Sequence, residues 1–564
     1  MVRKFSNHEK RKVDVLDGFW FFTTDGDNVG ESEKWQEKGF EGKSAFVPSC
    51  WNTDLGLLNY EGVCWYEKEF FFEGGTLRLE FGAVMTSAKV YLDGKYLGEH
   101  YGGFTAFSFI VENVTKGYHK VTVRVDNSFD DNSIPQKKVD WFHYGGITRS
   151  VTAEKIEGLT VIHNRFNYAL CNNQATCDFD LELYNATDES IEDEVKIYLD
   201  GEQKTTITVK VEARATVTVK TNRFIVENVR LWSVKSPNLY AVKIVTTTDD
   251  LFDRVGFRTI EVKNKKIYLN GEEFVFTGVN RHEENTENGM AFPPSLMQRD
   301  IDIIKQMNCN AIRGSHYPNN QIFVDMLDEQ GLAFWSEIPI WGCGFSVEAL
   351  ANPVIIERGL TMLKEMVKQY CNHPSILMWG MHNEIKTATT EGYEMSKVYY
   401  DYLKSVGDGR LIVFASMRPL EDICYEFCDV VCFNLYNGWY YSEIDSWDKL
   451  VTDLDEYLQK IGQSDKPIIA SEFGAASIYG YRTFDDIRWT EEYQSRLFDY
   501  TIDLFLNKSG YAGTFIWQFA NIRTYQGLDL NRARGYNNKG VVDEYRRPKS
   551  AYFTVKDAYA KFKK

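Results

Sequence analysis

Two glutamates follow apolar stretches of the kind that form buried strands. Glu384 closes the stretch that begins at Ile376, and Glu472 closes the stretch that begins at Ile468. Glycoside hydrolysis requires one carboxyl group that protonates the leaving oxygen and a second that attacks the sugar or activates water. Two surface carboxylates that cap neighbouring helices are the alternative. That alternative does not explain why polar residues gather after other predicted strands.

Polar and aromatic side chains follow several other predicted strands. Aromatic rings can stack on sugar faces, and Asn, His and Arg side chains can hydrogen-bond sugar hydroxyls. Taken singly, each residue fits a structural hydrogen bond equally well. They are Asn280, Arg281, His282, Glu283, Arg313, Ser315, His316, Tyr317, Glu337, Asn434, Tyr436, Trp439, Tyr440 and Trp517. Together they predict one polar, aromatic rim.

After residue 263, apolar strands alternate with helical stretches. Eight strands in about 300 residues match a (β/α)8 TIM barrel, in which catalytic groups lie at the carboxyl ends of strands. On the fourth and seventh strands, Glu384 and Glu472 would face the same mouth. The predicted strands are Phe274–Val279, Ala311–Ser315, Ala333–Ile338, Ile376–Met381, Leu411–Ala415, Val430–Leu435, Pro467–Ser471 and Thr514–Phe519. Predicted helices include Pro294–Met307, Pro353–Tyr370, Asp448–Ile461 and Thr490–Leu506.

The residues before the predicted barrel are expected to form β-structure. Residues 76–81 alternate with a period of two, and Asp93-Gly94 marks a tight hairpin turn. Many short strands predict a jelly roll or sandwich over residues 1–160. About 100 further residues of alternating strands predict an immunoglobulin-like sandwich over residues 161–262. The expected architecture is therefore a β jelly roll, an immunoglobulin-like β-sandwich and a TIM barrel over residues 263–564.

Composition limits the class of partner. The 564-residue chain carries 64 Lys and Arg against 81 Asp and Glu, a net charge of −17. This balance argues against a broad nucleic-acid or membrane interface, although a few local cations are enough for an anionic small substrate. The first twenty residues lack the apolar core of a secretory signal, and no stretch reaches the length of a transmembrane helix. We therefore expect a cytoplasmic protein.

The ten cysteines show no tight framework and fit free thiols in a reducing compartment. Cys424, Cys428 and Cys432 share an i, i+4 spacing that raises the question of a metal site. No His or acidic partner shares that spacing, so we favour burial on a short helix that runs into an apolar strand. We expect neither a metal nor an organic cofactor.

Four long stretches, GVNRHEEN, IRGSHYP, HPSILMWGMHNE and IIASEFG, resemble glycoside hydrolase family 2. Three further segments resemble the sugar-binding jelly roll of that family, namely Pro48–Asn52, Gly62–Tyr66 and Gly102–Phe104. The resemblance thus covers essentially the whole chain and implies the order jelly roll, immunoglobulin-like sandwich, catalytic barrel. It also implies a retaining exo-glycosidase, with Glu384 as the acid/base and Glu472 as the nucleophile.

The C-terminal region resembles the β-glucuronidases of that family. There an Asn-x-Lys pair binds the substrate carboxylate, and the pair maps to Asn537 and Lys539. A uronate needs a cation that a neutral hexose does not need. A solvated basic loop is the alternative, but residues 434–440 also resemble a glucuronidase motif. An arginine before the pair contacts the carboxylate in the family, and the spacing does not decide between Arg532 and Arg534.

Asp140 resembles an aspartate that reaches the sugar from the jelly roll. With the strand-end residues, the full predicted substrate-binding set is Asp140, His316, Asn383, Asn434, Tyr436, Trp439, Tyr440, Trp517, Arg532, Arg534, Asn537 and Lys539.

The sequence therefore predicts a bacterial-type, retaining exo-β-glucuronidase that releases glucuronate from small-molecule or oligosaccharide β-D-glucuronides. A β-galacturonidase needs the same residues to bind the substrate carboxylate, but its sugar has an axial O4. A β-galactosidase gives Lys539 nothing to bind, and a carbohydrate-binding protein with an inactive barrel does not account for two intact glutamates. We expect a homo-oligomer without nucleic-acid or membrane partners; the aglycone and the number of subunits stay open.

Overall fold

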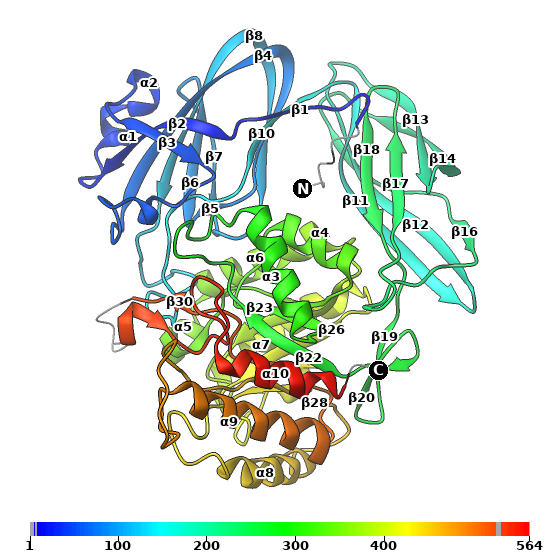
Figure 1. Ribbon diagram of the computed structural model, residues 1–564. Helices are drawn as coiled ribbons and strands as arrows, with labels where there is room; N and C mark the ends of the chain where they lie inside the picture. Colours follow the sequence, from blue (N-terminus) through cyan, green and yellow to red (C-terminus); the bar gives the residue numbers. More distant parts are fainter. Residues whose placement is uncertain (1–4, 6–7, 526–531, 563–564) are drawn as a thin grey trace.

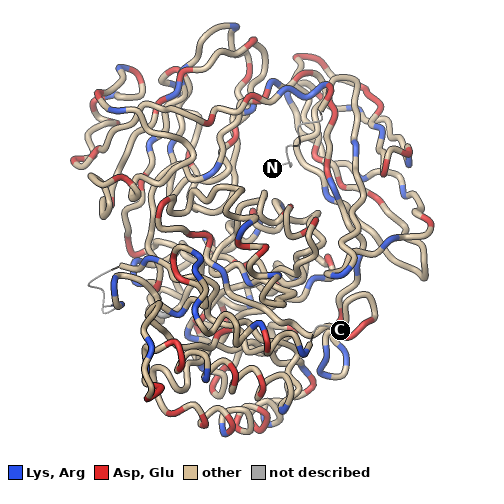
Figure 2. The backbone as a smooth tube through the Cα atoms, viewed as in Figure 1, with Lys and Arg blue, Asp and Glu red and all other residues tan. Residues whose placement is uncertain are grey.

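A computed structural model describes residue 5 and residues 8–525 and 532–562. Two β-domains lie side by side, and both rest on a barrel that contains the C-terminal half of the chain (Figure 1). Acidic and basic residues are interspersed along the backbone of all three parts (Figure 2). Within the described residues, no helix is long and apolar enough to cross a membrane.

The N-terminal domain is an antiparallel β-structure, as predicted. Its main sheet has the order β1-β10-β4-β8-β6-β7, and β2 pairs with both β3 and β4. The predicted turn at Asp93-Gly94 joins β6 to β7, with φ values of 50° and 78°. The elements are β1 (Lys12–Val15), β2 (Gly18–Asp25), α1 (Gly30–Glu33), α2 (Trp35–Lys38), β3 (Lys43–Val47), β4 (Val63–Phe81), β5 (Val84–Met85), β6 (Ser87–Leu92), β7 (Lys95–Tyr101), β8 (Phe107–Asp126), β9 (Gly146–Ile147) and β10 (Val151–Ile156).

The second β-domain is a sandwich of two antiparallel sheets. One has the order β11-β12-β15 with β16 beside β12, and the other has the order β14-β13-β17-β18. Phe179, Ile197 and Val242 are fully buried between them. The strands are β11 (Leu159–Cys171), β12 (Gln174–Asn185), β13 (Ile191–Leu199), β14 (Glu202–Val211), β15 (Thr216–Lys220), β16 (Phe224–Glu227), β17 (Tyr240–Val245) and β18 (Asp250–Val255). A small sheet, β19 (Ile260–Lys263), β20 (Lys266–Leu269) and β21 (Glu272–Glu273), leads into the barrel.

Eight parallel strands close the barrel, which confirms the predicted fold class. They are β22 (Phe276–Arg281), β23 (Ala311–Gly314), β24 (Ala333–Glu337), β25 (Ile376–Asn383), β26 (Leu411–Ser416), β27 (Val431–Asn434), β28 (Ile468–Glu472) and β29 (Gly513–Ile516). The eighth strand ends at Ile516 rather than Phe519, because the next amides bond elsewhere. Trp517 N donates to Phe473 O and Gln518 N donates to Lys539 O.

The barrel helices follow the predicted positions. Residues 490–506 differ slightly, since α9 ends at Ile502 and continues as the π-helical segment η4 (Asp503–Lys508). The side chain of Thr490 caps α9 by accepting from Tyr493 N. The α-helices are α3 (Pro294–Gln306), α4 (Gln321–Gln330), α5 (Val347–Leu350), α6 (Pro353–Tyr370), α7 (Thr390–Val406), α8 (Ser446–Lys460), α9 (Glu491–Ile502) and α10 (Ser550–Ala560). The short 3-10 helices are η1 (Trp51–Thr53), η2 (Gly342–Gly344), η3 (Tyr425–Phe427) and η5 (Ala533–Gly535), and β30 (Ile522–Arg523) pairs with β31 (Tyr536–Asn537).

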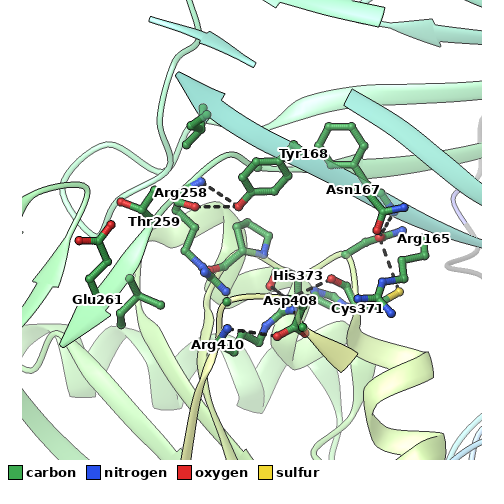
Figure 3. Close-up of a pocket in the computed structure, with 18 residues that line it drawn as sticks. Arg165, Asn167, Tyr168, Arg258, Thr259, Glu261, Cys371, His373, Asp408 and Arg410 are labelled. Carbon is green, nitrogen blue, oxygen red and sulfur yellow. Dashed lines mark hydrogen bonds and ion pairs between the residues drawn. The ribbon is translucent and has the colours of Figure 1, made fainter. Parts of the chain in front are cut away.

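A cavity of about 430 Å³ lies where the sandwich meets the amino-terminal ends of the barrel strands (Figure 3). Arg258 is buried there and donates to Pro374 O at 2.9 Å and Ile376 O at 2.7 Å. Its backbone bonds the hydroxyl of Tyr168 on β11. The cavity therefore marks a domain junction at the opposite end of the barrel from Glu384 and Glu472.

Candidate active site

The two predicted carboxylates lie at one mouth of the barrel. Glu384 follows β25 with a left-handed φ of 54°, a conformation that is uncommon outside glycine. Glu472 ends β28, and in the sheet it pairs with Asn434 of β27. Asn434 Nδ2 donates to Glu384 Oε1 at 2.9 Å and to Asn383 Oδ1 at 2.9 Å. Asn434 therefore contacts Glu384 through its side chain and pairs with Glu472 through its backbone.

Glu472 is held by a cation and a phenol. Arg313 Nη1 donates to Oε1 at 2.6 Å, and the hydroxyl of Tyr436 donates to Oε2 at 2.7 Å. Burial raises the pKa of Glu472 to about 7, against the opposing effects of Arg313 and Tyr436. The carboxyl group is therefore positioned by donors to both oxygens and titrates near neutrality.

Arg313 is the centre of a buried polar network. Its Nε and Nη2 donate to the two oxygens of Glu337, each at 2.9 Å. It also donates to Asn280 Oδ1 at 3.0 Å and to Asn383 Oδ1 at 2.7 Å. The network therefore connects four strands, from β22 to β25, to the glutamate on β28.

His316 lies between Glu337 and Glu472. Its Nδ1 is 2.8 Å from Glu337 Oε1, and its Nε2 is 3.9 Å from Glu472 Oε1. Burial, with help from the charge of Arg313, lowers the pKa of His316 well below its ordinary value. The ring stacks on Trp517 with centroids 5.2 Å apart. A neutral imidazole that donates from Nδ1 presents Nε2 as an acceptor on the side of Glu472.

Lys539 is a buried cation inside an aromatic cage. It is 1% exposed, and Nζ donates to the hydroxyl of Tyr440 at 2.6 Å. Nζ also lies over the rings of Tyr440, Tyr436 and Trp439, at 4.6, 5.3 and 5.9 Å from their centroids. Among the described residues, no carboxylate lies within ion-pair distance of Nζ. Burial is the main cause that lowers the pKa of Lys539 to about 7.

Asp140 reaches this region from the N-terminal domain. Arg532 grips it through Nε at 3.1 Å and Nη2 at 2.6 Å, and Asn537 Nδ2 donates to it at 2.8 Å. The guanidinium of Arg532 lies 5.6 Å from the ring centroid of Tyr440. Asp140, Arg532 and Asn537 therefore adjoin the cage around Lys539.

The structure separates the two arginines that sequence spacing left undecided. Arg534 donates to Glu544 at 2.9 and 3.0 Å and to Asn538 Oδ1 at 2.9 Å. Its side chain is 41% exposed, against 18% for Arg532. Arg534 is thus committed to a neighbouring loop, while Arg532 faces Asp140 and Tyr440.

Trp141 also lines the mouth, although the set predicted from the sequence does not include it. Its ring centroid lies 5.4 Å from His316 and 5.5 Å from His282, and 5.8 Å from Trp341. Its position next to Asp140 was the available signal. The N-terminal domain therefore contributes an aromatic wall to the mouth as well as a carboxylate.

Cys424, Cys428 and Cys432 are buried, as predicted. Their thiols contact main-chain oxygens, for example Thr387 O at 3.4 Å from Cys424 Sγ. Within the described part of the chain, one group of three side chains has ligand atoms close enough for a metal ion, Asp325, Asp328 and His373. His373 lines the junction cavity at the opposite end of the barrel, so this group is separate from the mouth.

Family models match almost the whole chain. Residues 13–156 match "Glycosyl hydrolases family 2, sugar binding domain", residues 160–258 match "Glycosyl hydrolases family 2", and residues 260–564 match "Glycosyl hydrolases family 2, TIM barrel domain".

Similar proteins include two kinds of uronidase. A β-glucuronidase of Paenibacillus borealis is 28% identical over 591 residues, which covers 96% of each protein. A family 2 β-galacturonidase from Eisenbergiella tayi, solved with bound galacturonate, is 34% identical with a TM-score of 0.92 and covers 100% of this chain and 99% of its own. The β-glucuronidase of Ruminococcus gnavus is 26% identical with a TM-score of 0.89, and 99% of each chain is covered.

Proposed function

The chain belongs to glycosyl hydrolase family 2, and we propose that it is a retaining exo-β-uronidase whose preferred substrates are terminal β-D-glucuronides. The observation that carries the proposal is the buried ammonium of Lys539. Buried charges in proteins are normally paired, because desolvation of an isolated ion is costly. Asp140, Glu472 and Glu384 act on Lys539 only through space, and a substrate carboxylate would supply a negative charge in direct contact with it.

The neighbouring groups suit a uronate more than a neutral sugar. Lys539 offers a point charge, and the Asn537 side chain two residues earlier offers a directional amide. Arg532 places a second cation at the edge of the cage, where its guanidinium also pairs with Asp140. A hydroxymethyl group in place of the carboxylate leaves Lys539 without a charged partner in direct contact.

In the first chemical step, a carboxylate oxygen of Glu472 attacks the anomeric carbon. The bond from that carbon to the aglycone oxygen breaks, and Glu384 donates its proton to the departing oxygen. Arg313 and Tyr436 keep both oxygens of Glu472 in position for the attack. The product of this step is a glycosyl ester on Glu472 with an ionised Glu384.

In the second step, Glu384 takes a proton from water, and the water oxygen attacks the anomeric carbon. The ester bond to Glu472 breaks, and the sugar leaves with the same anomeric configuration that it had in the substrate. Two inversions thus give net retention.

A panel of nitrophenyl β-glycosides tests the proposal. We expect kcat/KM to be highest for the glucuronide, and much higher than for the glucoside, which differs only at C6. A preference for a neutral galactoside or mannoside would refute the uronidase assignment and leave the family unchanged.

A β-galacturonidase is the second candidate, and a specific observation favours it. The protein of Eisenbergiella tayi that was solved with galacturonate is more similar to this chain in sequence than the glucuronidases named above. Both sugars present the same carboxylate to Lys539 and differ at O4. A higher kcat/KM for the galacturonide than for the glucuronide would select this candidate.

A further inference from the structure

Glu337 is a buried carboxylate at the end of β24 that the two steps above do not use. Its oxygens accept from two of the three nitrogens of the Arg313 guanidinium. The third nitrogen, Nη1, donates to Glu472 at 2.6 Å. All three side chains are at most 4% exposed. One cation is therefore shared between two carboxylates in a dry site.

The sharing decides how much negative charge Glu472 retains. An arginine that faced Glu472 alone would offset the whole negative charge of that carboxylate. The strong ion pair would make the carboxylate a weaker nucleophile. With Glu337 present, one cation and two carboxylates leave one net negative charge on the set. Burial raises the pKa of Glu337, and the charge and paired hydrogen bonds of Arg313 oppose that change.

We propose that Glu337 is a positioning residue that fixes Arg313 and offsets its charge, so that Arg313 orients Glu472 without neutralising it. The proposal rests on the nucleophile role given to Glu472 under the proposed function. It is independent of which sugar the enzyme prefers.

The same carboxylate orients His316. Since Glu337 Oε1 is 2.8 Å from His316 Nδ1, it fixes the tautomer that carries the proton on Nδ1. Nε2 is then an acceptor on the side of Glu472. Glu337 therefore sets both the cation and the imidazole beside the nucleophile.

Other charged or titratable groups also face Glu472. His316 approaches it to 3.9 Å, and Tyr436 donates to it. Glu384 and Lys539 act on the same pocket through space, from the loop after β25 and from the C-terminal region. The side chains of these groups are unchanged in Glu337→Gln, so the variant removes the negative charge that both Arg313 and His316 face.

The test is the pH dependence of kcat/KM for Glu337→Gln, measured on whichever nitrophenyl β-glycoside the wild type cleaves. We expect the acidic limb to move down by about one pH unit, because an unshared cation favours the ionised form of Glu472. We also expect the plateau to fall by roughly tenfold or more, because the paired carboxylate attacks less readily.

The matched control is Asp422→Asn, which removes another buried carboxylate. Asp422 bonds the hydroxyl of Thr387 at 2.5 Å and the amide of Cys424 at 2.8 Å, away from Arg313. Its acidic limb should stay at the wild-type pH. A limb that moves equally in both variants would show a general effect of lost buried charge and would overturn the proposal.

Glu337→Asp keeps the charge but withdraws it from Arg313, so its acidic limb should lie between those of the wild type and Glu337→Gln. Thermal melting shows whether each variant folds. If Glu337→Gln does not fold, the acidic limb of Glu337→Asp alone tests the proposal. An acidic limb that stays in place or moves to higher pH overturns the proposal. Failure of the wild type on uronides with cleavage of a neutral glycoside would instead refute only the uronidase assignment.

Discussion

At the scale of single residues, the two glutamates are predicted to differ in function. Glu472→Gln removes the nucleophile, so no glycosyl-enzyme forms with any leaving group. Glu384→Gln removes the proton donor, so an alkyl uronide should lose more of its rate than a nitrophenyl uronide, whose leaving group needs little protonation. Steady-state rates on the two substrates measure the difference.

Azide provides the control for these roles. It needs no general base, so it should rescue Glu384→Gln and give a glycosyl azide of retained β configuration. An azide product of inverted configuration from that variant would reverse the two assignments.

We predict that Lys539 stabilises the complex with a uronide substrate and lowers the free energy of unfolding of the free protein. Lys539→Met should lower kcat/KM for the uronide by roughly 10²-fold or more, since a charge-assisted bond in a dry site contributes a few kcal/mol. Hydrolysis of the matched glucoside should change little. Parallel losses on both substrates would indicate damage to the fold and contradict the carboxylate-binding role.

The same variant should be more stable than the wild type near neutral pH. The pKa of Lys539 is lowered to about 7 by burial, so between pH 7 and its ordinary value the unfolded chain binds the proton more tightly. The burial cost is therefore largest at and below pH 7 and fades as the pH rises toward 10.5. We expect Lys539→Met to raise the free energy of unfolding by on the order of 1–3 kcal/mol at pH 7, measured by denaturant titration, and by less at pH 9.

The pH profile should depend on the substrate. Glu472 must be ionised to attack, and its pKa is about 7, so activity on every substrate falls below that pH. The charge of Lys539 is lost above about pH 7 in the free enzyme, and only a uronate uses it. Because every substrate needs a protonated Glu384, both profiles fall at alkaline pH. We predict that the fall of kcat/KM on the uronide includes a titration step of Lys539 near pH 7 that the glucoside profile lacks. Identical profiles for the two substrates would contradict the role of Lys539.

At the scale of elements, the sequence predicted strands better than loops. Apolar runs define the barrel strands, because a parallel strand covered on both faces is a continuous hydrophobic segment. Glu384 and Glu472 were therefore placed at one mouth from strand position alone. The sharing of Arg313 between Glu337 and Glu472 could not be predicted, since it depends on side-chain directions from three separate strands.

Loop geometry also decides between the two C-terminal arginines. Arg534 adopts a φ of 63°, in the left-handed region, and its side chain bonds Glu544 rather than Asp140. Sequence spacing contains no signal for this reversal. The family resemblance located the loop, and the backbone conformation determines which arginine faces the site.

This gives a prediction for the loop. Arg532→Ala should lower kcat/KM for the uronide by roughly tenfold or more, because it removes the bidentate pair that fixes Asp140 beside Tyr440. Arg534→Ala, in the same loop, should stay within a few-fold of the wild type. Kinetic assays of the two variants side by side test this, and a larger loss in Arg534→Ala would show that the loop is arranged differently.

At the scale of the whole molecule, the mouth is assembled from two domains that are far apart in the chain. Asp140 comes from the N-terminal domain and bonds Arg532 and Asn537 of the C-terminal region. Asp140→Asn should therefore lower kcat/KM for the uronide by roughly tenfold while the melting temperature changes little. Asp131→Asn, an exposed change in the same segment, is the control and should leave both values unchanged.

Retaining hydrolysis of a uronide is tested most directly by following the first minutes of the reaction by proton NMR, before the free sugar mutarotates. We expect a β-uronide to be cleaved and the β anomer of the free uronic acid to appear first, with the α anomer following only by mutarotation. Early formation of the α anomer would contradict the double displacement through Glu472. Absence of uronide cleavage, in a preparation that hydrolyses a neutral β-glycoside, would contradict the uronidase itself.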